Sequence, residues 1–308
     1  MPIPCWIRQT LQAMHRVLPM ALAVFVANGL NVFLNWVFVF GHLGFHAMGV
    51  VGSAHATWIS RWLMLALVLW LSRADMRPAL RPWRHDAFAW RPIKRMIAIG
   101  APVGFQMFAE SFAFGLSGVI IGWFGAETLA AHQIALTMAS LTFMIPLGVA
   151  GAGAAMVGRA IGRGDMPAAR RDAVAALVCG VGFMALMAVL FVTLPGALAN
   201  LFTRDGPTIA IVMVLLPIAG VFQVFDGTQV VSASVLRGTG DTRVPMVLHV
   251  LSFWAVGIPL GVTLAFPLAM GPRGLWWGLT AGLASAAILQ LGRVRTHLRT
   301  EVARVHVD

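Results

Sequence analysis

The sequence contains very few charged residues for its length. Of its 308 residues, 11% are charged, whereas a typical soluble protein has about 25%. Hydrophobic residues make up 59% of the chain, and the mean hydropathy is +0.84. A soluble domain of this composition would have too few polar groups to cover its surface, so lipid must act as the solvent for much of the chain. This excludes soluble enzymes, coiled coils and disordered tails.

Cysteine, tyrosine and acidic residues are also scarce. The two cysteines, Cys5 and Cys179, form no CxxC pair and no zinc-ligand spacing, so a disulfide framework is not indicated. Tyrosine is absent, and 11 acidic residues stand against 22 basic ones, which gives a net charge of +11. Such a charge would usually suggest a nucleic-acid partner. Here the basic residues fall between apolar runs, so they indicate membrane topology and we expect no nucleic-acid partner.

Long apolar runs dominate what is present. A helix needs roughly 20 residues to cross the hydrocarbon core of a bilayer, and eight runs are long enough. Clusters of glycine, proline and charge separate them, as is typical of turns. The sequence therefore predicts an all-α, polytopic membrane protein with about eight transmembrane helices. The expected spans are 18–40, 50–71, 96–122, 129–158, 172–198, 208–235, 245–266 and 274–292.

Lysine and arginine are distributed very unevenly between the two sides of these spans. Nineteen lie in segments on one side and two on the other, while Arg61 lies inside a span. Positive residues favour the cytoplasmic side of a membrane. We therefore expect both termini in the cytoplasm, as an even number of spans requires.

A weak internal repeat connects the two ends of the chain. Residues 17–22 (Val-Leu-Pro-Met-Ala-Leu) align with 243–248 (Arg-Val-Pro-Met-Val-Leu), and 47–52 align with 269–274. Short apolar strings also recur by chance, so the match alone is not specific. If it is genuine, the repeat unit contains six helices and the chain holds one complete unit and the last two helices of another. Such repeats are typical of transporters, with the substrate site between them.

Two acidic residues lie inside predicted spans. Glu110 is in the third span and Asp226 in the sixth. A carboxylate at bilayer depth is costly unless it is paired or faces the protein interior, and it is usually functional. Burial favours the protonated form of both, as a proton carrier requires. The alternative is an acid neutralised by a buried arginine, or one that is permanently protonated in packing.

Helical spacing places polar neighbours on the same faces as these acids. Gln106 and Ser117 share the face of Glu110, while Phe222, Gln223 and Gln229 share the face of Asp226. The amides can hydrogen-bond a carboxyl group in either protonation state. We therefore predict a cation or substrate site formed by Glu110, Asp226, Phe222, Gln106, Gln223 and Gln229.

Two further rows of polar side chains either line a cavity or form hydrogen bonds between packed helices, and the sequence does not distinguish the two. Asn31 and Asn35 lie on one face of the first span, and Gln133 and Thr137 on one face of the fourth. Such side chains line cavities, but they also hydrogen-bond between helices. His132 stands near the same row without a second ligand at metal spacing, so we interpret it as a packing residue.

Two strings and one acidic position resemble the multidrug and toxic-compound extrusion (MATE) family, in its NorM-like branch. The strings are Gly-Ala-Glu-Thr-Leu-Ala-Ala-His-Gln-Ile-Ala-Leu at 125–136 and Leu-Arg-Gly-Thr-Gly-Asp-Thr-Arg at 236–243. The second follows Asp226 as in that family, and Phe108-Ala109-Glu110 matches the glutamate of the first helix in its C-terminal lobe. The likeness extends over nearly the whole chain.

The resemblance implies a two-lobed antiporter of twelve helices that exports small organic cations from a bacterial cell across its inner membrane in exchange for protons or sodium ions. Glu110 and Asp226 would be its cation-site acids, and sodium is a candidate ligand of both. No other cofactor, metal or catalytic residue is implied. The family often has tyrosine where this chain has Phe222, which removes one hydroxyl ligand for sodium.

Compared with that pattern, the first four helices are absent, and we expect a missing N-terminal lobe or a partner chain to complete the cleft. The expected organisation is a truncated N-terminal lobe, a basic cytoplasmic linker, a complete six-helix C-terminal lobe and a cytoplasmic tail, at 1–71, 72–95, 96–292 and 293–308.

Two other functions stay open on the sequence. One is a non-transporting fragment or membrane interaction protein. The other is a lipid-linked-sugar flippase, which would need several basic residues in its cleft to bind pyrophosphate; only Arg61 lies within a span, which argues against it. Because no nucleophile–base or metal-ligand group lies within the spans, an intramembrane enzyme is not expected.

Overall fold

The computed structural model describes residues 18–80 and 90–299. Part of the predicted linker and the end of the predicted tail lie outside the described residues. The regular secondary structure of the described residues is entirely helical, and eight helices in it are long and apolar enough to span a membrane. This confirms the predicted all-α membrane fold. The chain divides into two compact units, Met1–Ala89 and Trp90–Asp308.

The first unit is a helical hairpin. Helices α2 (Leu18–Phe40) and α3 (Gly49–Leu80) pack through a small core that includes Ala23, Ala27 and Val68. A side chain at Gly52 would come within 2.6 Å of the Phe38 carbonyl oxygen, so glycine is required where the two helices meet.

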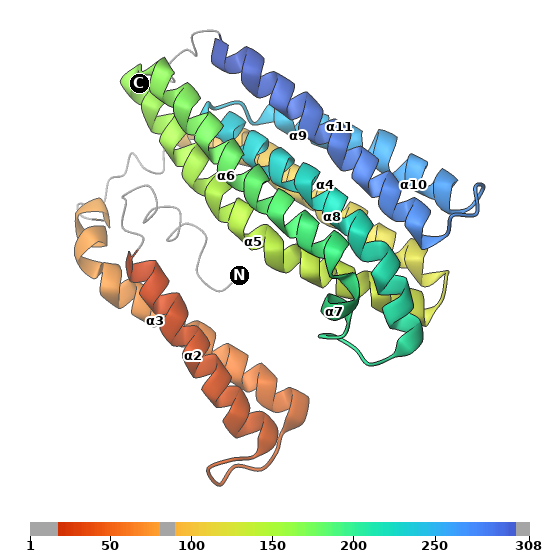
Figure 1. The fold of residues 1–308 in the computed structure, drawn as a ribbon. Coiled ribbons are helices and arrows are strands. Elements are labelled where there is room, and N and C mark those ends of the chain that lie inside the picture. Colours follow the sequence, from red (N-terminus) through yellow and green to blue (C-terminus); the bar gives the residue numbers. More distant parts are fainter. Residues whose placement is uncertain (1–17, 81–89, 300–308) are drawn as a thin grey trace. The chain divides into compact units, whose positions relative to one another are not determined.

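The second unit is a bundle in which the long helices run alongside one another (Figure 1). Its centre is α8, which packs against α5, α6 and α11 and contributes many of the buried core side chains. The elements are α4 (Trp90–Gly122), α5 (Ala126–Arg163), α6 (Met166–Thr193), α7 (Pro195–Ala199), α8 (Gly206–Gly238), α9 (Arg243–Leu251), η2 (Ser252–Gly257), α10 (Ile258–Ala265) and α11 (Pro272–Arg299).

Local sequence chemistry makes the tight turns between these helices. Gly164 ends α5 with φ +78°, a conformation that favours glycine, and Asp165 then begins α6 by accepting a hydrogen bond from the Ala168 N–H at 2.9 Å. Asp205 begins α8 in the same way. Hydrogen bonds from Thr208 hold the pKa of Asp205 below its usual value.

Glycines bring α10 and α11 into backbone contact. Gly274, Gly278 and Gly282 are spaced four residues apart on α11. An added Cβ at Gly282 would lie 2.8 Å from the Cα of Gly257, and one at Gly278 would overlap Gly261. This is the small-residue packing of membrane helices, which gain stability from close contact because lipid provides no hydrophobic driving force.

The two copies of the predicted repeat share a local backbone geometry. Each Ala-Met-Gly string ends in a glycine with positive φ, +53° at Gly49 and +60° at Gly271, just before or at the start of a helix. The methionine N–H in each string also bonds back to the preceding helix, Met48 to Phe38 and Met270 to Leu264.

Several predicted span boundaries were wrong. Helix α5 is longer than the predicted 129–158, and the predicted 172–198 began too late and continued across the break between α6 and α7. Helix α3 extends beyond the predicted 50–71, into the expected linker, and α11 continues into the expected tail. Apolar runs report the thickness of the hydrocarbon, whereas helices continue into the interface, where charged residues are tolerated.

The predicted span 245–266 is not one regular helix. It consists of α9, the π-helical turn η2 and α10. Pro259 follows this turn and has no N–H to donate within a helix, and the wider turn before it bonds the Ile258 N–H to the Phe253 carbonyl. Such turns are frequent at functional sites.

Candidate functional site

The carboxylate of Glu110 lies next to a histidine that the sequence analysis did not select. The Oε2 atom of Glu110 is 3.4 Å from Nε2 of His249, which α9 contributes. The His249 side chain is completely buried, whereas 26% of the Glu110 side chain is exposed. An ionisable pair therefore joins α4 to α9 inside the bundle.

Gln229 determines which nitrogen of His249 carries the proton. The amide nitrogen of Gln229 lies 3.0 Å from Nδ1 of His249. Since an amide nitrogen only donates, Nδ1 accepts, and the neutral ring carries its hydrogen on Nε2, the ring nitrogen that lies 3.4 Å from Glu110. The predicted site residue Gln229 thus contacts the histidine beside Glu110 and not Glu110 itself.

Asp226 is half-buried on α8 and interacts electrostatically with Glu110. The structure therefore brings together the two acids that the sequence analysis selected. Their helices differ, so only the packing of α4 and α9 against the bundle places them within range of each other.

Arg237 adds a positive charge to the same group. Its Nη2 atom donates to Oε1 of the buried Gln106 at 3.2 Å, and the guanidinium interacts electrostatically with Glu110. Among the described residues, the basic side chain in close contact with Glu110 is His249 and not Arg237. The carboxylate is therefore balanced by basic groups without being fixed to a guanidinium.

Two predicted site residues lie in the core near this group. Phe222 is buried, and its ring centroid lies 6.0 Å from that of Phe114 and 5.8 Å from that of Trp276. Gln223 is also buried, and its Oε1 accepts a hydrogen bond from Thr142 of α5. Within the described residues, Gln223 is thus bonded to α5 and not to Glu110 or Asp226.

The two rows of polar side chains are held largely within their own helices. Asn35 donates to the backbone and side-chain oxygens of Asn31 at 2.9 and 3.1 Å. Gln133 and Thr137 are exposed on the second unit, and the Thr137 hydroxyl donates to the Gln133 carbonyl. Their lining of a cavity stays a prediction.

The sequence analysis missed His249 and placed Arg237 in a loop. Helix α8 continues to Gly238, so Arg237 is a helical residue inside the sixth candidate span. The sequence contained a feature that could have identified each of these two residues. Arg237 stands eleven residues, three helical turns, after Asp226, and His249 is a histidine within an apolar span.

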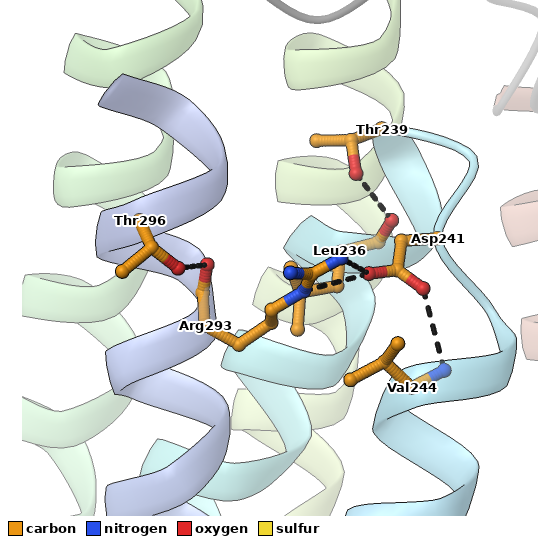
Figure 2. Close-up of polar contacts among 6 residues, drawn as sticks. All are labelled: Leu236, Thr239, Asp241, Val244, Arg293 and Thr296. Carbon is orange, nitrogen blue, oxygen red and sulfur yellow. Dashed lines mark hydrogen bonds and ion pairs between the residues drawn. The ribbon is translucent and has the colours of Figure 1, made fainter. Parts of the chain in front are cut away.

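The motif at 236–243 contacts α5, α9 and α11 through Gly238 and Asp241. The Arg293 guanidinium on α11 reaches Oδ2 of Asp241 at 3.0 Å, and Oδ1 of Asp241 accepts from the Val244 N–H that opens α9 (Figure 2). A Cβ at Gly238 would lie 2.5 Å from the Ala154 carbonyl oxygen, so glycine is needed where α8 meets α5.

Removing Asp241 and removing Arg293 should lower the free energy of unfolding by different amounts. Asp241→Ala leaves the Val244 N–H and Arg293 without their acceptor, so we expect it to lower the stability of the detergent-solubilised chain by about 1–3 kcal/mol. Arg293→Ala should cost less than about 1 kcal/mol, because 37% of its side chain is exposed. Unfolding followed by tryptophan fluorescence measures both. Equal losses would contradict the role assigned to Asp241.

Comparisons with known proteins agree on one family. The MatE family model matches residues 102–263. The multidrug resistance protein NorM of Burkholderia vietnamiensis is 42% identical over 88% of this chain and 59% of its own length. A probable multidrug resistance protein NorM of Mesorhizobium japonicum is 40% identical over 93% of this chain and 63% of its own length.

Solved structures show the same fold at lower sequence similarity. The eukaryotic MATE transporter AtDTX14 superimposes with a TM-score of 0.82 at 20% identity, over 95% of this chain and 67% of that one. The chain spans about three fifths of the length of the curated relatives it matches. Because the family model covers more than half of its residues and close relatives match most of its length, the chain belongs to the MATE family of multi-pass membrane transporters, in its NorM-like branch.

Proposed function

We propose that this chain takes part in the export of lipophilic organic cations, driven by exchange against protons at Glu110 and Asp226. The observation that carries the proposal is the group formed by these two carboxyls, His249 and Arg237 within the bundle. Relatives of the chain are named multidrug resistance proteins. An incoming organic cation and a proton would compete for the same carboxyl groups, so each expels the other.

The energies are adequate for such an exchange. One pH unit supplies about 1.36 kcal/mol per proton, and a membrane potential of 100 mV supplies about 2.3 kcal/mol per charge. Exchange of one proton for one monovalent cation moves no net charge, so a gradient of one pH unit alone supports a concentration ratio of about tenfold, and the membrane potential adds to it only if more than one proton enters per cation. Binding of a cation in place of a proton leaves the charge of the site unchanged, which avoids an unpaired buried carboxylate.

The groups around Glu110 support protons rather than sodium as the coupling ion. Sodium needs several oxygen ligands, as other hard cations do. Glu110 instead lies beside the ring N–H of His249 and near Arg237, and neither group has a lone pair with which to coordinate a metal ion. The ring of Phe222 provides no oxygen on the face of Asp226.

A chain of aromatic rings beside the carboxyls suits an apolar cation. The ring centroid of Phe253 lies 4.8 Å from that of His249 and 5.9 Å from that of Phe114. The Phe114 ring in turn packs against Phe222. Phe222 and Phe253 are buried, so a cation would reach their faces only when the surrounding helices move apart; aromatic faces then attract organic cations without requiring one particular shape. This supports a permissive substrate class rather than a single substrate.

For the location we propose the inner membrane of a bacterial cell, with both termini in the cytoplasm. The uneven distribution of basic residues and the bacterial origin of the NorM relatives support this. We further propose that helices equivalent to the first lobe of a MATE transporter complete the transport cleft.

Proton release on binding tests the exchange directly. Purified chain in lipid nanodiscs is titrated with tetraphenylphosphonium in weakly buffered solution containing a pH indicator. We expect up to one proton to be released per cation bound, and the affinity to fall as the pH decreases, because protonated carboxyls no longer attract the cation. Replacing potassium by sodium at constant ionic strength should change neither quantity.

Each other outcome contradicts part of the proposal. Binding that sodium weakens and that releases no proton would mean that sodium is the exchanged ion. Binding that neither pH nor sodium changes would place the organic cation away from the carboxyls. An absence of saturable binding would overturn the proposed function of this chain.

A further inference from the structure

A groove between α6 and α11 combines an apolar wall with a cluster of arginines. It has a volume of 520 Å³. Its wall includes Val174 and Leu177 of α6 and Leu291 of α11, and its charged end is formed by Arg170, Arg295 and Arg299. The groove lies apart from Glu110 and Asp226 and has no part in the proposed exchange.

The three arginines lie together at one end because the helices run in opposite directions. Arg170 is in the second turn of α6, and Arg299 is the last residue of α11. Arg170 donates to the carbonyl oxygens of Leu298 at 2.7 Å and of Arg299 at 3.2 Å. These bonds satisfy carbonyl groups that the end of α11 would otherwise leave free, and they fix the floor of the groove.

Arg295 and Arg299 have no carboxylate partner within the part of the chain that the structure describes. The nearby ion pair on α11 is formed by Arg293, which already holds Asp241. Asp165 of the α5–α6 turn is used as the N-cap of α6. Considering residues 90–299 alone, the mouth of the groove therefore carries positive charge without a neighbouring carboxylate.

The depth of the wall matches the hydrocarbon of a bilayer. Val174 and Val178 lie 8 and 12 residues into α6, roughly 12–18 Å along the helix at 1.5 Å per residue. We therefore expect the guanidinium groups at the level of the lipid headgroups and the wall in the acyl-chain region. A soluble phosphate compound would leave this wall uncovered, whereas a phospholipid matches both parts.

A second groove shows what an ordinary lipid-facing surface of this bundle looks like. It has a volume of 380 Å³ between α6 and α8, and its lining, which includes Val189 and Phe225, has no charged residue. The arginines are therefore a property of the first groove and not of every groove on this surface.

We propose that the groove between α6 and α11 binds one anionic phospholipid from the leaflet on the arginine-rich side, with its phosphate on Arg295 and Arg299 and an acyl chain along the apolar wall. Basic pockets between membrane helices recognise anionic headgroups through charge–charge attraction and hydrogen bonds. A bound lipid would hold α6 and α11 together where Arg170 already joins them.

Lipid retention measured by native mass spectrometry tests this proposal on the detergent-purified chain. We expect added phosphatidylglycerol to remain bound at one copy per chain while phosphatidylcholine does not. Arg295→Gln with Arg299→Gln should weaken phosphatidylglycerol binding by about tenfold or more, since each basic group near the lipid contributes independently. The matched control, Arg163→Gln with Arg171→Gln, removes the same charge outside the groove lining and should change it by less than about twofold.

Two further arms keep the test decisive. Val178→Trp fills the apolar wall without altering charge and should expel the lipid, whereas Val189→Trp in the uncharged groove should not. If the arginine variant does not fold, this pair decides alone. Equal retention of both lipids, equal losses in the two arginine variants, or displacement of the lipid by millimolar inorganic phosphate would overturn the proposal.

Discussion

Asp226→Asn is expected to reduce the proton release that accompanies cation binding to the part that Glu110 supplies, and to weaken binding of tetraphenylphosphonium by at least about tenfold. Asparagine has the size of aspartate and keeps a hydrogen-bonding oxygen, so the packing of α8 should survive. It cannot carry a negative charge or lose a proton, however. Since Asp226 is half-buried within electrostatic range of Glu110, losing its charge removes one of the two attractions for the cation.

Glu110→Gln should have the same direction of effect. Glutamine matches glutamate in size, so the packing of α4 against α9 at His249 should be preserved while the exchangeable charge is lost. Asp172→Asn is a matched control, because it removes a half-buried carboxyl from α6 outside the site. The measurement is the proton-release titration of the nanodisc-embedded chain. Wild-type proton release in both site variants would exclude exchange at these carboxyls.

Among glycine-to-alanine substitutions in the second unit, Gly278→Ala is expected to lower the free energy of unfolding most. The added Cβ would overlap the backbone of Gly261, and backbone cannot rotate away as a side chain can. The two helices must therefore separate along their whole contact, which should cost about 3 kcal/mol. Thermal or denaturant unfolding of the purified chain measures this loss.

Gly292→Ala on the same helix provides the control. Nothing lies within 4 Å of a Cβ added there, so alanine should be neutral or should stabilise the chain by up to about 1 kcal/mol through its higher helix propensity. Gly282→Ala should resemble Gly278→Ala, because its Cβ would lie 2.8 Å from the Cα of Gly257. Equal stability of the Gly278 and Gly292 variants would show that α10 and α11 pack less closely than described.

The membrane fold could be predicted because it follows from local chemistry. Each span needs only enough consecutive apolar residues, and each turn needs a local breaker, such as Gly164 followed by Asp165. Span ends were less certain, since a helix such as α8 continues past its apolar run to include Arg237. Hydropathy alone cannot detect this continuation.

The candidate site could be predicted only in part. Glu110 and Asp226 stand out because a carboxyl within an apolar run is costly, and that cost can be read without a structure. Helical spacing also selected Gln106 and Gln229, which contact Arg237 and His249. The same spacing selected Gln223, which instead bonds to Thr142, because one face of a helix can meet more than one neighbour.

The sequence by itself determined that this chain crosses a membrane about eight times and carries two acids within its spans, since both depend on residues adjacent along the chain. Only the tertiary structure decided which groups those acids meet. The contact between Glu110 and His249 joins residues far apart in sequence, and it depends on how α4 packs against α9. The arginine-lined groove likewise requires the start of α6 to lie beside the end of α11. Helix packing sets such contacts through shape and small residues, which leave no periodic signal in any one segment.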